Sequence, residues 1–221
     1  MCFSAPASFT ASFILAAVGT VTLTKTSSKE KLLLASFPLL FATQQFCEGM
    51  VWLTVGNNNL KSINLIFTNF YLMFAVGVWL LFCPLAVYFL EKNHQLKKLI
   101  LGIALIGLCQ GLYLFGSVIL NDVNTRAFAG HIFYDLNFIP FYKAHQYLYL
   151  LITCLPFLIA SHRLLKVLAV LGVISFALAQ LFYQMTFVSV WCFFAAVISA
   201  FVYLIIADFK NNSEPLSGKA V

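Results

Sequence analysis

Residues 63–90 read INLIFTNFYLMFAVGVWLLFCPLAVYFL, and this stretch contains no charged residue. A helix needs about 20 mostly apolar residues to cross the hydrocarbon core of a bilayer, so the stretch predicts a transmembrane helix. The whole chain agrees, because 62% of its 221 residues are hydrophobic and only 9% are charged. A soluble domain has roughly a quarter of its residues charged. We therefore expect a membrane protein whose few charges lie in loops.

The same pattern recurs on both sides of this stretch. Apolar runs separated by short polar segments predict an all-α bundle of seven transmembrane helices. The expected spans are residues 5–23, 32–55, 63–90, 99–120, 141–160, 164–183 and 186–207. We expect residues 1–210 to form one membrane domain and residues 211–221 to be a disordered cytoplasmic tail.

The basic residues between these spans fall on two sides in unequal numbers. Ten lie on one side, namely Lys25, Lys29, Lys31, Lys92, Lys97, Lys98, Arg163, Lys166, Lys210 and Lys219. Three lie on the other side, namely Lys61, Arg126 and Lys143. The positive-inside rule places the richer side in the cytoplasm. This bias predicts an N-terminus outside the cell and a C-terminus in the cytoplasm.

The longest connection, residues 121–140, lies on the outer side in this topology. Its apolar residues recur at helical spacing, namely Phe128, Ile132, Leu136 and Ile139. Its charged residues fall largely elsewhere on the helical wheel. We predict an amphipathic helix that lies in the outer membrane interface.

Polar side chains within the spans concentrate in the half nearer the outer side. Each must find a partner or water, because an unpaired polar group in hydrocarbon is costly. This layer supplies the candidate binding residues Gln45, Trp52, Asn69, Gln110, Tyr134, Gln146, Gln180, Trp191 and Cys192. The inner halves of the spans are almost wholly apolar. We therefore expect a site that is open to the outside and closed toward the cytoplasm.

Glu48 is the only carboxylate clearly inside an expected span. Its spacing places Gln44 and Gln45 on the same helix face. It is the candidate catalytic residue, acting as a general acid or base or as a metal ligand. The alternative is a hydrogen-bonded glutamate that joins two helices. The sequence supports both interpretations equally.

His131 and His145 are the only histidines expected on the outer side. On the predicted interfacial helix, His131 and Asp135 are four residues apart, so the carboxylate can orient the imidazole. His131, Asp135 and His145, together with Glu48, predict a site for a divalent metal such as zinc, with an open position for water. No HExxH or HxxxH spacing supports this site, and the alternative is a pair of solvated or structural histidines.

Four patches of the chain carry a resemblance. They are MCFSA at residues 1–5, Gln45 with Glu48, Gly49 and Trp52, His131 with Tyr134, and SVWCFFAA at residues 189–196. Together they resemble an uncharacterised, domain-of-unknown-function family of small bacterial multi-pass membrane proteins. The resemblance implies the bacterial inner (plasma) membrane and supplies no activity. The family often has a histidine just before the glutamine, where this chain has Gln44; if that histidine binds metal in the family, this member lacks one ligand.

Three classes of function are open. The first is a metal-assisted hydrolase of a lipid or other amphiphile in the outer leaflet. The second is a binding, sensor or transport protein for a small solute or a lipid headgroup, and the third is a structural membrane subunit. The chain has no basic stripe interleaved with aromatic residues, so nucleic acid is excluded as a partner. Membrane lipids and a lipid or small-molecule ligand are the expected partners.

Overall fold

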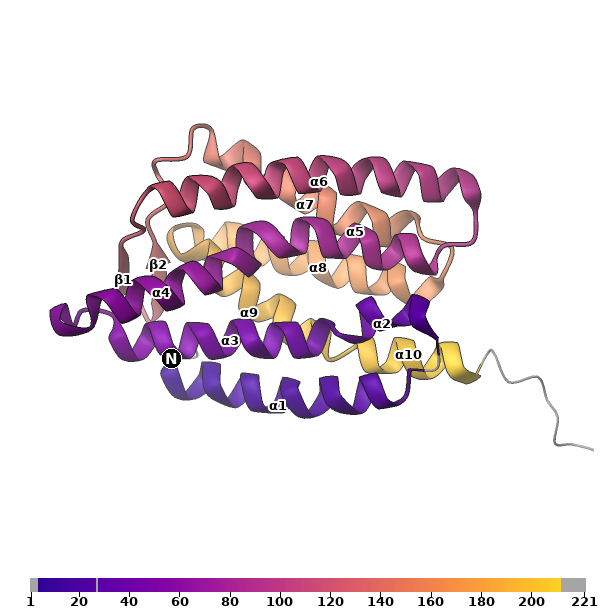
Figure 1. Ribbon diagram of the computed structural model, residues 1–221, viewed down its shortest axis with the longest axis horizontal. Coiled ribbons are helices and arrows are strands. Elements are labelled where there is room, and N and C mark those ends of the chain that lie inside the picture. The colour runs from indigo at the N-terminus through magenta and orange to yellow at the C-terminus, as the bar shows by residue number, and fades with distance from the viewer. Residues whose placement is uncertain (1–3, 27, 212–221) are drawn as a thin grey trace, which may run out of the picture.

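The structure is a computed structural model in which residues 4–26 and 28–211 are described. Helices dominate it, and Figure 1 shows them running side by side along the long axis of the molecule. In chain order the elements are α1 (Ala5–Thr24), α2 (Lys29–Ala35), α3 (Phe37–Thr54), η1 (Asn58–Leu60), α4 (Lys61–Leu72), η2 (Met73–Val78), α5 (Trp79–Leu90), α6 (His94–Leu120), β1 (Thr125–Phe128), β2 (His131–Tyr134), α7 (Tyr142–Ile159), α8 (Arg163–Phe182), η3 (Gln184–Thr186), α9 (Phe187–Ser199) and α10 (Val202–Asn211). Residue 211, expected in the tail, ends α10, and the rest of that tail lies outside the described residues.

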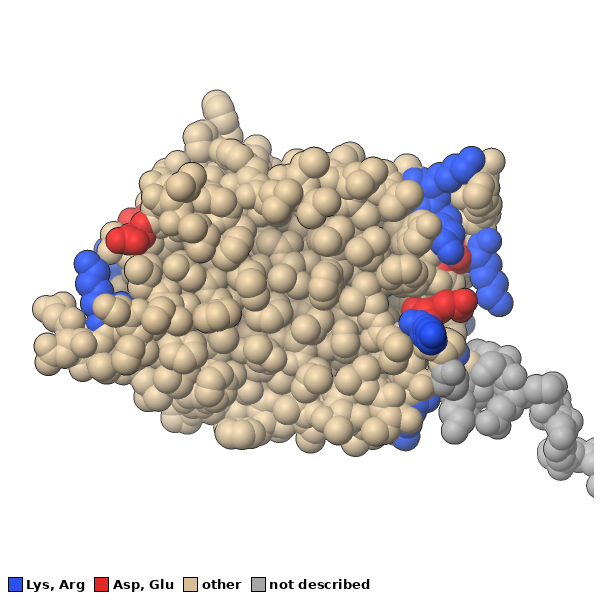
Figure 2. Space-filling model, viewed as in Figure 1, with Lys and Arg blue, Asp and Glu red and all other residues tan. Residues whose placement is uncertain are grey.

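The flank of the molecule is apolar. Among the described residues, five helical segments are long and apolar enough to cross a membrane: Ala5–Thr24, Asn58–Leu90, His94–Leu120, Arg163–Phe182 and Gln184–Phe209. Large side chains on them face outward, as Leu112 (67% exposed) and Leu181 (74% exposed) illustrate. In the view of Figure 2, charged residues gather at the two ends and leave the flank between them free of charge. Such a surface suits hydrocarbon and not water, so this is a membrane protein.

Successive helices pack as neighbours because the connections between them are short. Helix α1 lies against α3, α5 against α6, and α7 against α8 (Figure 1). Elements that are distant in the sequence also meet, since α9 packs on α3 and α10 packs on α1 and α2. Each of the seven stretches predicted to be helical is helical in the structure.

Three of those stretches are interrupted. The second divides at Ser36 into α2 and α3, and Pro38 stands in the first turn of α3, where its missing N–H costs nothing. The third contains the π-helix η2 between α4 and α5. Short π-helical turns within helices are often found at functional sites. The last stretch divides between α9 and α10.

Helix α6 approaches η2 and α5 closely through two glycines. A Cβ atom on Gly107 would lie 2.1 Å from the carbonyl oxygen of Leu80, and one on Gly111 would lie 3.1 Å from that of Gly77. Larger side chains at these positions would push the helices apart. Small residues therefore allow the backbones to touch, as is common in membrane bundles.

The predicted amphipathic helix in residues 121–140 is wrong. Strands β1 and β2 form an antiparallel hairpin there, with Phe128 paired with His131. The two-residue turn has positive φ at Ala129 (48°) and Gly130 (78°), and such turns match the twist of the flanking strands. Aromatic and β-branched side chains in β2 favour a strand. The apolar spacing instead places side chains of β2 and the following loop in the core, namely Ile132, Leu136 and Ile139.

The end of the bundle opposite this hairpin carries most of the charge. We name it the basic end, and its basic residues are Lys25, Lys29, Lys31, Lys92, Lys97, Lys98, Arg163 and Lys166. The carboxylate of Glu91 accepts hydrogen bonds from the backbone N–H groups of Lys92 and Asn93, and from the N–H and hydroxyl of Ser161, at 2.8–2.9 Å. These bonds join the α5–α6 connection to the α7–α8 connection.

Helix α10 is fixed at the same end. His162 lies 3.2 Å from the carboxylate of Asp208, and the amine of Lys25 donates a hydrogen bond to the hydroxyl of Tyr203. The basic end is therefore closed by bonds between segments that are far apart in the sequence.

Candidate functional site

Glu48 lies in the interior of the bundle, on α3 and facing α9. Its side chain is 1% exposed, and its carboxylate accepts a hydrogen bond of 2.5 Å from the hydroxyl of Ser189. The amide of Gln45 lies beside this carboxylate. Gln44 accepts a hydrogen bond of 2.8 Å from the indole N–H of Trp79 on α5. The polar face predicted on this helix thus bonds to two other helices.

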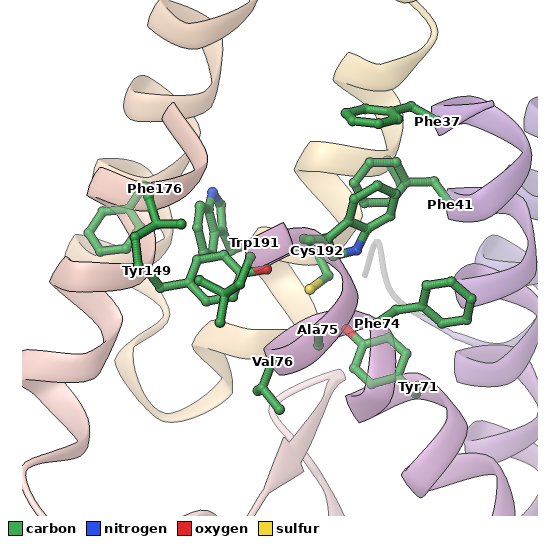
Figure 3. Packing of buried hydrophobic residues seen from close by; sticks show 14 of the residues in the cluster. Phe37, Phe41, Tyr71, Phe74, Ala75, Val76, Tyr149, Phe176, Trp191 and Cys192 are labelled. Atoms are coloured by element: carbon green, nitrogen blue, oxygen red, sulfur yellow. The ribbon is translucent and has the colours of Figure 1, made fainter. Parts of the chain in front are cut away.

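Tyr71 and Cys192 complete this group. The ring of Tyr71 stacks on that of Tyr134, with centroids 4.9 Å apart, and its hydroxyl donates to the carbonyl oxygen of Val188 at 3.3 Å. Figure 3 shows the sulfur of Cys192 and the hydroxyls of Tyr71 and Tyr149 pointing into the same interior space. We name this set the buried cluster; it comprises Gln44, Gln45, Glu48, Tyr71, Ser189 and Cys192.

The buried cluster is closed to solvent. Gln44 and Gln45 are 0% exposed, and Glu48 lines none of the cavities of about 690, 100 and 20 Å³ that the bundle contains. The bonds from Ser189 to Glu48 and from Trp79 to Gln44 cross helix interfaces, and such bonds hold membrane helices together. The geometry favours the interpretation of Glu48 as a helix-joining residue over that of a general acid or base.

The second polar region is the cavity of about 690 Å³, at the end of the bundle that carries β1 and β2. We name it the hairpin-end cavity. Its walls come from β2, residues 136–141, the first turns of α7, the last turn of α8, η3 and the start of α9. On its wall the amide of Gln180 donates a hydrogen bond of 2.9 Å to the amide oxygen of Gln146. This bond joins α8 to α7.

The hairpin-end cavity is positively charged. Arg126 and Lys143 both line it and are exposed. The guanidinium of Arg126 lies 4.5 Å from the ring centroid of Phe133, its cross-strand partner. Among the described residues, no Asp or Glu lines this cavity. The arrangement suits an anion that is held by charge and by amide groups, next to aromatic surface.

The predicted metal site has no support in this geometry. Because His131 lies on a strand, it lacks the helical i, i+4 relation to Asp135, whose carboxylate accepts bonds from the backbone and amide of Asn137. His131 packs edge-on against Tyr183, and burial lowers its pKa. The ring of His145 lies 5.3 Å from that of Tyr113. Residues 4–26 and 28–211 contain no group of three or more His, Cys, Asp or Glu side chains that could hold a metal ion.

Comparison with known proteins supplies a family. The profile described as "Family of unknown function (DUF6629)" matches residues 1–216. The chain belongs to this family. The expected membership in an uncharacterised domain family is therefore confirmed. No curated protein and no solved structure matches the chain. Membership brings no activity with it, so the function of this DUF6629 member is argued from its own geometry.

The other predicted binding residues of this DUF6629 member are scattered. Gln146 and Gln180 line the hairpin-end cavity together with Tyr134. Gln110 on α6 is used structurally, since its amide donates to the backbone oxygen of His145 at 3.0 Å. Three more sit on separate helices, namely the half-buried Trp52 on α3, the half-buried Asn69 on α4 and the 9% exposed Trp191 on α9. The predicted single polar layer is thus a buried cluster, a cavity and several isolated side chains.

Sequence reasoning overlooked three residues of these regions. Arg126 and Lys143 entered only the count of basic residues, although they provide the charge of the hairpin-end cavity. Tyr71 was not distinguished from the other aromatic residues of its span. The sequence did contain a signal for Arg126 and Lys143. The positive-inside rule predicts few basic residues on the outer side, so each one found there is a candidate for a specific role.

Proposed function

We propose that this protein is a seven-span bacterial plasma-membrane protein that binds an amphiphilic ligand at its outer face without catalysing its turnover. The observation that carries the proposal is the hairpin-end cavity. Its volume of about 690 Å³ lies in the range of small-molecule sites, and its lining combines two cations, two bonded amides and aromatic surface. Such a lining suits a charged headgroup attached to an apolar body.

The charge distribution supports a topology with the hairpin end outside. The eight described basic residues of the basic end follow the rule for cytoplasmic loops, while the hairpin end carries Lys61, Arg126 and Lys143. The two stretches outside the five candidate spans lie alongside them, since α3 packs on α1 and α4, and α7 packs on α5 and α8. An 18-residue helix such as α7 is about 27 Å long, close to the hydrocarbon thickness.

Binding is favoured over hydrolysis by the position of the groups that chemistry would need. The candidate acid or base, Glu48, is bonded to Ser189 away from the cavity. The cavity itself offers amides, cations and phenols, which orient a ligand. A role as a structural subunit would not explain why two positively charged side chains line this cavity.

The proposal is tested with purified protein in a neutral detergent. Lysophosphatidylglycerol, which is anionic, is compared with lysophosphatidylcholine, which is zwitterionic, by thermal stabilisation and by native mass spectrometry. We expect the anionic probe to stabilise the wild type more. The double variant Arg126→Gln/Lys143→Gln should weaken its binding about tenfold, because charge-assisted hydrogen bonds are lost.

Lys61→Gln is the matched control, because Lys61 is an exposed lysine at the same end that lies outside this cavity. It should bind the anionic probe as the wild type does. Equal weakening in both variants would reduce the effect to general surface charge and contradict the proposal. Appearance of free fatty acid in the wild-type incubation would replace binding by hydrolysis as the function.

A further inference from the structure

Two smaller cavities follow the hairpin-end cavity along the bundle. A small cavity of about 20 Å³ shares Tyr142, Gln146 and Phe187 with it. That small cavity in turn shares Trp191 and Cys192 with a third cavity of about 100 Å³. We name the second cavity the neck and the third the groove. Their shared walls place all three in one series that runs inward from the hairpin end.

The neck is narrow. A volume of about 20 Å³ holds about one water-sized group. So small a space favours a slender, unbranched chain over a ring system or a branched body.

The groove is almost wholly apolar. Side chains of α3, α5, α7, α8 and α9 line it, including Phe157, Leu168, Ala195 and Ile198. Two of the three hydroxyls in its wall are used locally, since Thr153 donates to the backbone oxygen of Tyr149 and Ser199 to that of Ala196, and the third belongs to Tyr149. Hydrocarbon is the chemistry that this lining fits.

One unused polar group lies where the neck meets the groove. Trp191 is 9% exposed, and its indole Nε1 has no hydrogen-bond partner among the described residues. Figure 3 shows this indole with Phe176 on one side and Cys192 on the other. Trp191 lies one turn along α9 from Phe187 of the hairpin-end cavity, a rise of about 6 Å. That offset suits an ester carbonyl just below a headgroup.

We infer that the ligand is an anionic phospholipid of the surrounding membrane, with its phosphate beside Arg126 and Lys143, an ester carbonyl at Trp191, and one acyl chain running through the neck into the groove. The inference rests on the proposed function and deepens it by naming the ligand class. Charge complementarity fixes the headgroup end, and the order of the three adjacent cavities gives the path of the chain. The cavities extend along α9 from Phe187 to Val202 at the start of α10, about 20 Å, which a long acyl chain can follow.

Chain length provides the first arm of the test. Binding of lysophosphatidylglycerol with octanoyl, lauroyl or palmitoyl chains is measured by native mass spectrometry on the full chain in a neutral detergent. Affinity should rise by up to about fourfold for each methylene that enters the groove. Ala195→Trp fills the groove, so it should bind the palmitoyl probe at least tenfold more weakly and leave the octanoyl probe within about twofold of wild type. Ile198→Trp repeats the test from the same helix if the first variant does not fold.

Ala17→Trp is the matched control, because Ala17 is an exposed alanine on α1 far from the groove in the sequence and outside its lining. It should bind all three probes as the wild type does. Identical chain-length dependence in Ala195→Trp, Ile198→Trp and the wild type would overturn the inference. In that case the sensitivity to Arg126→Gln/Lys143→Gln would still report on the proposed function, so the two failures are distinguishable.

The ester carbonyl provides the second arm. An ether-linked analogue of the palmitoyl probe lacks the acceptor, so the wild type should prefer the ester by about fivefold, the value of one neutral hydrogen bond. Trp191→Phe should abolish that preference while retaining the aromatic surface. Inorganic phosphate and glycerol phosphate are the headgroup-only probes. Binding of either as tightly as the palmitoyl lipid would show that the site takes a free anion, and would overturn the inference.

Discussion

The two ends of the bundle are built from the same helices, but the connections at each end have different structures. At the basic end, Glu91 and Ser161 join two connections directly, and the pair His162–Asp208 fixes α10. At the hairpin end, the strands β1 and β2 stand over a cavity of about 690 Å³. At one end bonds join the connections to each other, whereas at the other a connection lines the largest of these cavities, since the cavity at the basic end beside Lys29 and Glu30 is about 520 Å³.

The difference lies in the length of the connections between helices. Short connections at the basic end bring backbone N–H groups within reach of one carboxylate, so the segments close on each other. The longer connection at the hairpin end is held at its start, where Thr125 donates to Asn64 at 2.7 Å and Asn64 donates to Thr54 at 3.0 Å. The rest of that connection lines the hairpin-end cavity together with the ends of α7 and α8. The proposed binding site thus depends on one long connection.

Removing the carboxylate of Glu91 should give the largest loss of stability. Glu91→Ala leaves four donors without their acceptor, three of them backbone N–H groups, and we expect the free energy of unfolding to fall by about 2–3 kcal/mol. The measurement is unfolding in mixed micelles with increasing SDS. Glu30→Ala, an exposed glutamate at the same end, should change stability by less than about 0.5 kcal/mol. Equal effects of the two variants would show that the basic end is not closed by Glu91.

The same contact should make the basic end sensitive to acid. Burial raises the pKa of Glu91, but the bonds from Asn93, Ser161 and Lys92 outweigh it and hold the pKa below the ordinary value of 4.5. A depressed pKa stabilises the folded state above the pKa of the unfolded chain, and this contribution is lost as the pH falls through the folded value. The stability difference between wild type and Glu91→Ala should therefore be constant near neutral pH and shrink below about pH 4.5. A difference that does not change with pH would contradict this assignment.

Glu48 should matter for stability but not for ligand binding. Glu48→Ala removes the acceptor of Ser189 and leaves a small cavity, so we expect a loss of about 2 kcal/mol. Glu48→Gln keeps an acceptor oxygen in place and should lose less than half of that. A double-mutant cycle with Ser189→Ala should give a coupling of about 1 kcal/mol. If Glu48→Gln lowered the affinity for lysophosphatidylglycerol without lowering stability, Glu48 would belong to the binding site instead.

The apolar spans and the charge bias could be predicted from the sequence, because the hydrophobicity of a span and the charge of a loop are properties of that segment alone. Residues 63–90 are apolar whatever they pack against. The sequence did not predict which polar residues lie in the buried cluster and which line the cavity, because this depends on which helices face each other. Glu48 and Gln146 look alike as polar side chains in a span, yet one bonds to Ser189 in a sealed interior and the other lines a cavity. The predicted metal site found no support for a related reason, since the prediction assumed helical spacing between His131 and Asp135, and His131 lies on a strand.

Substitutions in the hairpin turn should change the stability least, and the sign of the change should be clear. In a helix, replacing Ala129 by glycine would cost about 1 kcal/mol, because glycine is a poor helix former. In the observed turn, Ala129 has a φ of 48°, a region that disfavours residues with a Cβ atom. Ala129→Gly should therefore stabilise the protein by about 0.5–1 kcal/mol, whereas Gly130→Ala should destabilise it by a similar amount, since Gly130 has a φ of 78°. Both signs would be reversed in a helix, where Ala129→Gly would destabilise and Gly130→Ala would stabilise the protein. Because Ala129 does not line the hairpin-end cavity, Ala129→Gly should also leave the affinity for lysophosphatidylglycerol unchanged.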